Sequence, residues 1–463
     1  MRKVAQYILA VTAAGTMAML VGACGGGGGG AGTPVVANGD ITALGSITVA
    51  GIKFEDTLAN ITADDTPKTA AFLQPGMMVK VSGARGDDVS GSAAEIEVEN
   101  EVRGAVTAVG ADSLTVLGQA VFVDGGTVFA NAAGLGGIVA GDNVEVHGAR
   151  DVTGDILATR VEKLNANPLG DELRGVVATK VGTTAGTFTI GGSALTFSFD
   201  NNTALPHGAF EVGETVEIHL TGTAATRVER EDVEDDKFKA GEGQEMQVEG
   251  FVSNFVATPG TFLVEGKPVE TTQATRFEGG LVTDLVNDVK VEAEGHIRLA
   301  DNTLLVDKIK FKDSVRIETN VEAVAANSLT VFGKTVQVTS KTKNAVLLGT
   351  LAPGNGVRIR GFMNQDNTSF TATELQSSNP VAADQHIFQG KVMSLTGSSM
   401  VLGKPLPGGL TVNVSGAGEF RDDDENLLSA PVFLGSLRPG VTVVKARGAF
   451  ASGTLTANKA EIE

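Results

Sequence analysis

The sequence contains no tryptophan and one tyrosine, Tyr7, close to the N-terminus. Carbohydrate sites and single-strand nucleic-acid sites usually stack their ligands on aromatic side chains. Only phenylalanine can supply such platforms in the rest of the chain, which counts against both kinds of site. The formal net charge is −19 at pH 7, and so acidic a surface repels nucleic acid and anionic lipid headgroups. We therefore expect no nucleic-acid partner.

Cysteine is almost absent, because Cys24 is the only one. It follows the basic residues Arg2 and Lys3 and an apolar stretch at 8–21, an arrangement typical of a secretion signal and too short for a convincing membrane span. The tetrapeptide Val21-Gly22-Ala23-Cys24 resembles a bacterial lipobox, which implies lipidation of Cys24. An ordinary signal peptide with a chance cysteine is the alternative. Without a second cysteine no disulfide can form, so stability must come from β cores.

Residues 1–23 are thus predicted to be a signal peptide, and 24–39 a tether headed by the lipidated cysteine. Six consecutive glycines at 25–30 predict that this tether is flexible. By resemblance to Gram-negative lipoproteins, Gly25 in place of aspartate after the cysteine favours the outer membrane. We expect a lipid-anchored protein of the bacterial cell envelope, on its periplasmic or surface face.

Glycine is abundant, with 60 residues, and its positions repeat. The stretch Val102–Leu164 holds short runs that alternate apolar and polar residues, such as NVEVHG and ILATRVEKL, separated by Gly and Asp turns. Alternation of this kind buries one face of a strand and exposes the other. About five such strands predict a small antiparallel barrel or sandwich.

Three anchors of this unit recur in fixed order along the chain. The first is seen as SITVAG, SLTVLG, GTFTIG, GTFLVEG, SLTVFG and SSMVLG, and the second includes PGMMVKVSG, AGDNVEVHG and PGNGVRIRG. The third closes each copy, as in ILATRVEKL and TAATRVERE. We predict an all-β fold: a tandem array of about six small antiparallel five-stranded, OB-like barrels. A pair of three-stranded sheets shared between copies is the alternative. The predicted repeats are 40–101, 102–164, 172–228, 246–313, 314–378 and 386–463, with an acidic linker at 229–245.

These anchors resemble domain-of-unknown-function family 5666, small domains repeated in exported bacterial proteins. Its copies carry a G-x-[IV]-T-A-x-G start, an S-[IL]-T-V-x-G turn, a G-[MD]-x-V-x-V-x-G strand and an A-T-x-I-E-x ending. The match is clear in 40–99, 102–164 and 314–378 and looser in the third, fourth and sixth copies. The third copy, for example, has Leu220 where glycine should follow the fourth strand. The resemblance implies a fold and no activity.

Candidate chemistry is sparse. The acidic stretches 231–236 and 422–425 lack the spacing that folds carboxylates around Ca²⁺, so we interpret them as solvated charge. His147 and His219 occupy equivalent places beside Glu145 and Glu217 and are interpreted as surface residues, and the other histidines share no placement. No G-x-S-x-G elbow or phosphate-binding glycine loop occurs. We predict no catalytic, cofactor or metal residue, and Cys24 as the one modified site.

The leading hypothesis is a non-enzymatic envelope lipoprotein that acts as a spacer, scaffold or protein-binding array. Its expected partners are the membrane, through Cys24, and an envelope protein. A small-molecule or glycan-binding module on the barrel faces is the alternative. A hydrolase with unrecognised carboxylates in the divergent copies is the third hypothesis, because paired carboxylates need no sequence signature.

Overall fold

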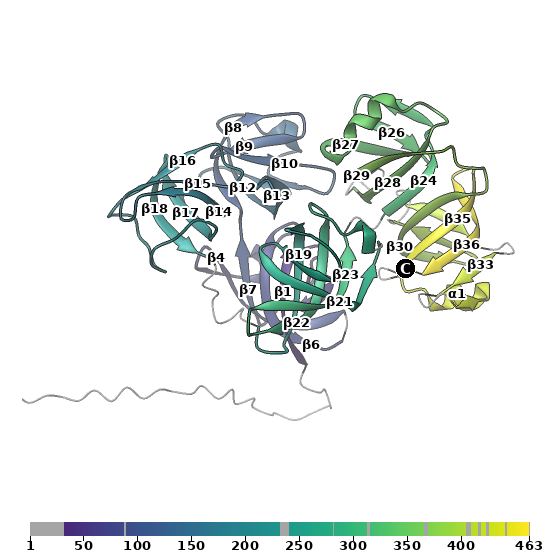
Figure 1. The fold of residues 1–463 in the computed structure, drawn as a ribbon, viewed down its shortest axis with the longest axis horizontal. Coiled ribbons are helices and arrows are strands. Elements are labelled where there is room, and N and C mark those ends of the chain that lie inside the picture. The colour runs from purple at the N-terminus through teal and green to yellow at the C-terminus, as the bar shows by residue number, and fades with distance from the viewer. Residues whose placement is uncertain are drawn as a thin grey trace, which may run out of the picture. The chain divides into compact units, whose positions relative to one another are not determined.

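The computed structural model describes residues 32–87, 89–231, 240–280, 282–312, 315–364, 369–403, 409–414, 418–422, 426–439 and 442–462. Gly32–Glu463 forms one compact unit. Strands dominate it, and α1 (Ala430–Ser436) is the one α-helix of this described part (Figure 1). The predicted all-β class is confirmed. No described helix has the length and apolar character to cross a membrane. The predicted signal peptide and Cys24 lie outside the described residues.

The template stretch Val102–Leu164 folds into barrel 2. Its strands are β8 (Val102–Val109), β9 (Ser113–Val116), β10 (Gln119–Phe122), β12 (Asn143–Arg150) and β13 (Ile156–Leu164), with β11 (Val128–Ala130) and the 3₁₀ turn η2 (Leu135–Gly137) between β10 and β12. Antiparallel pairs join β8 to β9, β9 to β10, β13 to β12 and β12 to β8, and a parallel pair joins β10 to β13. The ring therefore closes in the order first, second, third, fifth, fourth, as expected for an OB-like barrel.

The same ring of pairings closes three more barrels. Barrel 3 consists of β14 (Asp171–Val181), β15 (Gly186–Ile190), β16 (Thr196–Phe199), β17 (Thr215–Thr221) and β18 (Ala224–Arg230). Barrel 4 consists of β19 (Glu245–Ser253), β20 (Gly260–Val264), β21 (Lys267–Glu278), η3 (Val282–Asp284), β22 (Lys290–Arg298) and β23 (Thr303–Phe311). Barrel 6 consists of β30 (His386–Thr396), β31 (Ser399–Leu402), β32 (Leu410–Asn413), β33 (Glu419–Arg421), β34 (Leu427–Leu428), α1, β35 (Val443–Ala451) and β36 (Thr454–Ile462).

Barrels 1 and 5 have an interrupted first strand. Barrel 1 consists of β1 (Thr33–Asp40), β2 (Ile47–Val49), β3 (Ile52–Glu55), β4 (Asn60–Ala63), β5 (Thr66–Lys68), η1 (Ala70–Phe72), β6 (Met78–Arg85) and β7 (Ser90–Glu99). Barrel 5 consists of β24 (Val315–Asn320), β25 (Ala323–Ala325), β26 (Ser328–Val331), β27 (Lys334–Lys343), η4 (Ala345–Thr350), β28 (Gly356–Met363) and β29 (Ser369–Ser378). Barrel 1 closes through a bridge between Ala43 and Thr48, and barrel 5 through the pair β25–β26.

The first strand corrects the predicted tether. Residues 33–39, expected to belong to it, form most of β1. Val35 and Val36 are buried there, so their apolar side chains are held by packing although the segment follows a glycine-rich run. The expected acidic linker is shortened in the same way, because Glu229 and Arg230 end β18 and Glu245 begins β19. Its residues 232–239 lie outside the described part.

Two recurring glycines have clear structural causes. In barrel 2, Leu117 and Gly118 both have positive φ, 50° and 70°, the backbone of a two-residue hairpin turn that favours glycine at its second position. Gly148 sits at a β-bulge between β12 and β13. A Cβ atom at Gly148 would lie 2.4 Å from the carbonyl oxygen of Leu157. The same bulge falls at the equivalent glycine of four other barrels and beside Leu220 in barrel 3.

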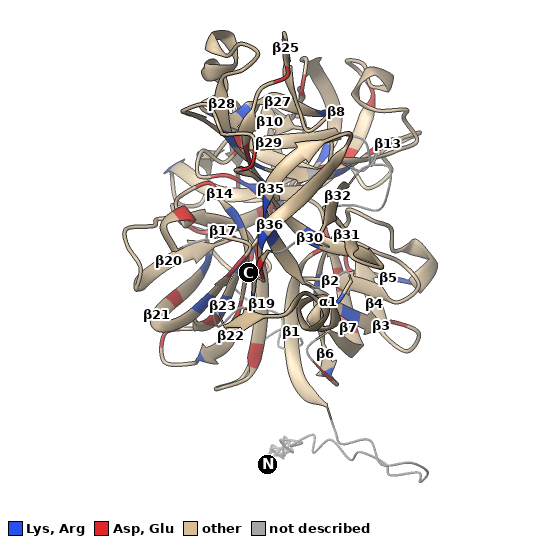
Figure 2. Cartoon of the chain, turned by 90° about the vertical axis from the view of Figure 1, so that its right-hand side faces the viewer, with Lys and Arg blue, Asp and Glu red and all other residues tan. Residues whose placement is uncertain are grey.

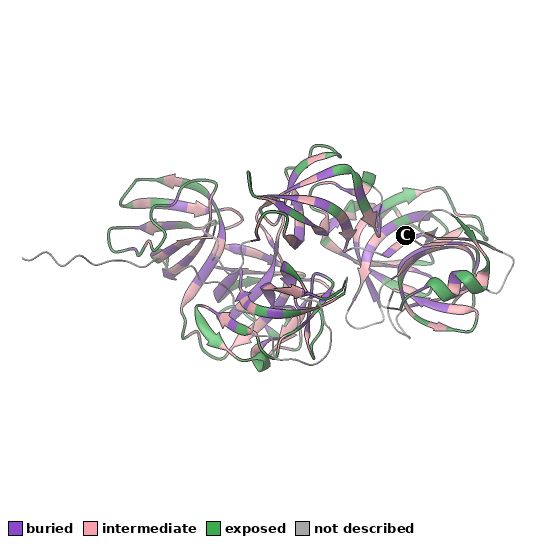
Figure 3. Cartoon of the chain, turned by 90° about the horizontal axis from the view of Figure 1, so that it is seen from below, coloured by how far each residue is buried: buried purple, intermediate pink, exposed green. Residues whose placement is uncertain are grey.

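Strand pairing also joins the barrels two by two. β1 pairs with β19 in parallel and links barrels 1 and 4, which are far apart in the sequence (Figure 1). β8 pairs with β14 and links barrels 2 and 3, and β24 pairs with β30 and links barrels 5 and 6. Two of these links carry a continuous apolar core, since one buried cluster runs through barrels 2 and 3 and another through barrels 5 and 6, whereas barrels 1 and 4 have separate clusters. Buried residues lie along the strands and exposed ones gather in the turns (Figure 3).

Candidate functional site

Barrels 2 and 3 meet through a repeated Glu-x-Arg-Gly motif. It reads Glu101-Val102-Arg103-Gly104 at the start of β8 and Glu172-Leu173-Arg174-Gly175 in β14. The antiparallel β8–β14 pair sets Arg103 opposite Glu172 and Val102 opposite Leu173. Arg103 Nη2 donates to Glu172, and Arg174 Nη1 donates to Glu101 Oε1 at 2.9 Å. The two motifs thus exchange arginines in a reciprocal, two-fold-like arrangement.

The two glutamates of this exchange are not neutralised to the same extent. Glu101 also accepts from Arg150 Nε at 2.6 Å, so two arginines neutralise it. Arg103 is shared with Asp64 at 3.0 Å and Glu145 at 3.2 Å, and is 1% exposed. Glu172 therefore receives only part of one arginine. Burial and the nearby charge of Glu217 raise the pKa of Glu172 to about 9, against the lowering effect of Arg103.

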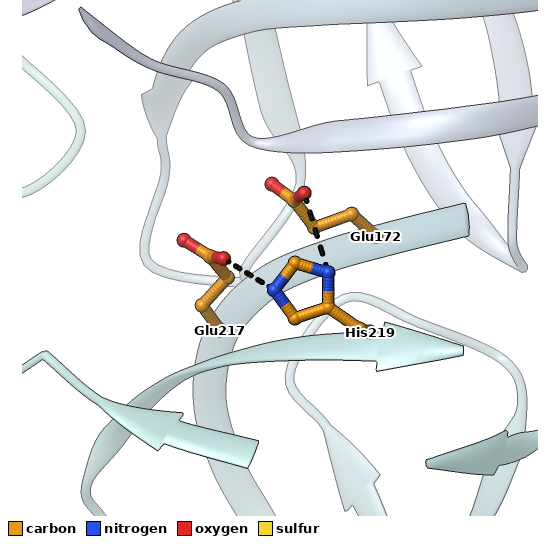
Figure 4. Close-up of side chains that lie close together, drawn as sticks. All are labelled: Glu172, Glu217 and His219. Atoms are coloured by element: carbon orange, nitrogen blue, oxygen red, sulfur yellow. Dashed lines mark ion pairs between the residues drawn. The ribbon is translucent and has the colours of Figure 1, made fainter. Parts of the chain in front are cut away.

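His219 lies beside this poorly neutralised carboxylate (Figure 4). Strands β14 and β17 place His219 opposite Glu172. Its Nδ1 lies 3.7 Å from Glu172 Oε2, and its Nε2 lies 3.0 Å from Glu217 Oε1 and 3.8 Å from Glu229 Oε2. Ligand atoms of Glu172, Glu217 and His219 all lie within 4.8 Å of one another. These three side chains form the His219 cluster, whose imidazole and carboxylate groups are metal ligands by chemistry.

The equivalent histidine of barrel 2 has another environment. His147 is 1% exposed, so its interpretation as a surface residue is wrong. Its Nδ1 hydrogen-bonds the backbone carbonyl of Glu99, and Nε2 lies 3.4 Å from Glu145 Oε1. Docking of the segment that leads from barrel 1 into barrel 2 covers the ring, which strand alternation alone could not show. His219 is partly exposed, at 22%.

The remaining histidines are separate from one another. His207 is exposed, His296 pairs with Asp307 at 2.8 Å, and His386 bonds Thr319 at 2.8 Å. Of the acidic stretch 231–236, the structure describes Glu231, whose Oε2 lies 3.6 Å from both Lys80 Nζ and Arg174 Nη2. Of 422–425 it describes Asp422, which accepts the backbone N–H of Asn426 at 2.7 Å. Glu231 therefore joins barrel 1 to barrel 3 and its interpretation as solvated charge is wrong, whereas Asp422 makes a local contact.

A second feature is a cavity of about 710 Å³ lined by residues of barrels 1 to 4. Val36, Met246 and Phe251 contribute apolar walls. Three polar atoms on its lining, Asn38 Oδ1, Arg174 Nε and Glu265 Oε2, are buried and make no hydrogen bond with the described residues. Burial and the charge of Glu101 raise the pKa of Glu265 to about 7. Apolar walls with a few converging polar groups are typical of small-molecule sites.

Sequence reasoning missed both features. The duplicated Glu-x-Arg-Gly and Val-Glu-[Val/Ile]-His motifs were the available signal for the His219 cluster, since only copies two and three carry both. The cavity has no such signal, because it is assembled from four barrels through pairings such as β1–β19.

Comparison with known proteins agrees with the repeat pattern. The model of the family described as Domain of unknown function (DUF5666) matches five segments, at 36–97, 103–162, 249–310, 319–376 and 389–461. The expected number of six family repeats is therefore wrong. Barrel 3 has the same strand order but no match, in keeping with Leu220 at its bulge. The looser fourth and sixth copies do match.

Among solved structures, the chain is similar to Drosophila Unr CSD456, at 12% identity and a TM-score of 0.13, over 46% of this chain and 98% of that one. No curated protein matches the sequence. The five family segments together span more than half of the chain. The chain therefore belongs to the DUF5666 family, as a tandem array of its domains.

Proposed function

We propose that this protein is a non-enzymatic lipoprotein of the bacterial cell envelope, a scaffold that presents a rigid multi-barrel body to an envelope protein partner. The observation that carries the proposal is the way in which the barrels are fixed to one another. If the barrels were independent domains, only flexible linkers would connect them. Here three strand pairs continue from barrel to barrel, and ion pairs connect the resulting pairs of barrels.

Several contacts of this second kind are short and partly buried. Arg103 Nη1 of barrel 2 lies 3.0 Å from Asp64 Oδ1 of barrel 1. Lys341 Nζ of barrel 5 lies 2.9 Å from Asp155 Oδ2 of barrel 2. Gln389 Nε2 of barrel 6 donates to the carbonyl of Gly279 in barrel 4 at 3.0 Å. Within barrel 4, acidic residues of β22 lie opposite basic residues of β23, as Glu292 does opposite Lys310 (Figure 2). A body held in this way keeps its surfaces at fixed spacing, which suits a scaffold.

Membrane attachment is the other part of the proposal. Its support is the lipobox-like Val21-Gly22-Ala23-Cys24 and the glycines that follow it. A lipid on Cys24 would hold the first barrel close to the bilayer. Because β1 starts at Thr33, the remaining tether of about eight residues gives a coil reach of only about 15 Å.

Fractionation and crosslinking test the two parts separately. Cys24→Ser should move the protein from the membrane to the soluble fraction, and persistent membrane association would refute lipidation. In-cell crosslinking of the wild-type protein should give a discrete adduct with one envelope protein, which C24S reduces. A protein that crosslinks to nothing in intact cells, while membrane-bound, would end the scaffold proposal.

Small-molecule binding is a second candidate, favoured by the 710 Å³ cavity and its three unbonded polar atoms. A thermal-shift screen of polar metabolites and short glycans against the full chain tests it. Met246→Trp should narrow the cavity and reduce any shift, whereas a substitution at exposed Val346, in barrel 5 and outside the cavity, should not. A hit that M246W leaves unchanged would place the ligand elsewhere.

A further inference from the structure

We propose that Glu172, Glu217 and His219 bind a Zn²⁺ ion in barrel 3. The three residues come from two adjacent strands, β14 and β17, so the barrel itself holds them together. Their ligand atoms lie within 4.8 Å of one another. A tetrahedral Zn²⁺ with bonds of about 2.0–2.2 Å keeps its ligands about 3.4 Å apart. Glu217 lies nearer Nε2 of His219 and Glu172 nearer Nδ1, so the proposal requires the Glu172 side chain to turn toward Nε2 when the ion binds.

The negative charge around the His219 cluster is not fully neutralised by nearby basic residues. Glu172 is 2% exposed and shares Arg103 with Asp64 and Glu145. Glu229 lies nearby, and Arg227 Nη2 is bonded to it at 2.5 Å. Buried carboxylates without full compensation are costly, and a divalent ion between Glu172 and Glu217 would remove their mutual repulsion.

The imidazole of His219 also supports a metal site. Its Nε2 is buried and makes no well-formed hydrogen bond with any described residue, although Glu217 lies 3.0 Å away. An imidazole nitrogen in this state is available as a ligand. The side chains of His219 and Glu217 are 22% and 26% exposed, so an ion can enter from solvent and keep a water as its fourth ligand.

The ligand types select the metal. Ca²⁺ requires six to eight oxygen ligands and Mg²⁺ keeps most of its waters, so neither gains from an imidazole. One nitrogen and two carboxylates with an open position suit Zn²⁺. Arg103, bonded to Glu172, would orient that ligand from the second shell. The proposal is independent of the scaffold function, since its three ligands all belong to barrel 3.

Barrel 2 supplies the internal contrast. His147 Nδ1 is held by the carbonyl of Glu99, and Glu101, the equivalent of Glu172, is bonded to Arg150 and Arg174. His147 Nε2 is likewise buried without a hydrogen bond, but no group of three candidate ligand side chains surrounds it among the described residues, so we expect no metal at His147.

Titration calorimetry of the full-length protein in detergent, stripped with EDTA, tests the site. The wild type should bind one Zn²⁺ with higher affinity than Ca²⁺ or Mg²⁺, and Co²⁺ should give the absorption bands of a tetrahedral nitrogen and oxygen site. Loss of a second-shell partner costs about 10–100-fold in metal affinity, so His219→Ala should weaken binding by more than that. Glu217→Gln should do the same at a partly exposed position where folding is not at risk.

Two variants serve as matched controls. His207→Ala, on an exposed loop of the same barrel, and His296→Ala, in the exposed pair with Asp307, should bind Zn²⁺ as the wild type does. Unchanged binding in both H219A and E217Q, or binding lost only in H296A, would overturn the proposal. So would a wild type that binds Ca²⁺ as tightly as Zn²⁺.

Discussion

Barrels 2 and 3 carry the same polar residues at equivalent positions and use them differently. Glu101 and Glu172 begin the same motif, and His147 and His219 follow the same strand pattern. In barrel 2 the glutamate has two arginines and the histidine has a backbone carbonyl. In barrel 3 the glutamate has part of one arginine and the histidine faces three carboxylates.

The difference comes from what docks against each barrel. Arg150 of barrel 2 reaches Glu101, but Leu220 and the residues after it supply no arginine to Glu172. The loop of barrel 1 instead brings Asp64, which competes for Arg103. A duplicated motif therefore becomes structural or functional according to its neighbours. Barrel 3 is also the one barrel that the family model does not match.

Removing Arg103 should have the largest effect on this contrast. Arg103→Met leaves Asp64 and Glu145 without their common cation, and breaking a buried pair in this way costs about 3–5 kcal/mol. Urea unfolding at pH 7 measures the loss. Arg227→Met, which removes a 37% exposed arginine bonded to Glu229, should cost less than about 1 kcal/mol. Equal losses of stability in the two variants would show that the burial of Arg103 does not determine how much its ion pairs stabilise the fold.

Glu265 is a buried carboxyl near Glu101 that lacks full neutralisation, as Glu172 does. It should make the folding stability depend on pH. Its pKa is raised to about 7, by burial first and by Glu101 second. A carboxyl pKa raised on folding means that the unfolded chain releases the proton earlier, so stability falls as pH rises from about 4.3 to 7 and then levels. The loss from this group is up to about 4 kcal/mol.

Glu265→Gln should remove that part of the pH dependence. Unfolding measured at pH 5 and pH 8 for both proteins checks it, with Glu270→Gln, a partly exposed residue of the same barrel, as control. Parallel pH curves for wild type and E265Q would contradict the assignment.

The sequence was informative where chemistry is local. The hairpin at Leu117–Gly118 and the bulge at Gly148 follow from turn and steric requirements that recur with the strands. The strands of barrel 2 follow from alternation, which left a barrel and a sandwich open; the pairings β10–β13 and β12–β8 close the ring. The start of β1 was misplaced because glycine-rich composition outweighed the apolar pair Val35–Val36. The β1–β19 pairing and the burial of His147 depend on docking between distant segments, for which a single sequence carries no periodic signal.

Substitution of the two glutamates tests the contrast between the barrels directly, with smaller expected losses of folding free energy. Glu101→Gln weakens bonds from Arg150 and Arg174 and should cost about 2 kcal/mol, the range for hydrogen bonds between charged groups. With EDTA at pH 7, Glu172→Gln should cost less than about 0.5 kcal/mol, because a carboxyl with a pKa of about 9 is already mostly protonated. Urea midpoints compare the two. A larger loss for E172Q would mean that Arg103 neutralises Glu172 fully.

Substitution of the two histidines should give the smallest losses of stability, and only the His219 variant should lose the response to Zn²⁺. His147→Ala leaves the Glu99 carbonyl without its side-chain donor and should cost about 1–2 kcal/mol. In EDTA, His219→Ala removes a partly exposed ring with no well-formed hydrogen bond at Nε2 and should cost less than about 0.5 kcal/mol. Saturating Zn²⁺ should raise the melting temperature of wild type and H147A but not of H219A, because an ion bound only to the folded state stabilises it. Equal Zn²⁺ shifts in all three proteins would separate the His219 cluster from metal binding while leaving the contrast between the barrels intact.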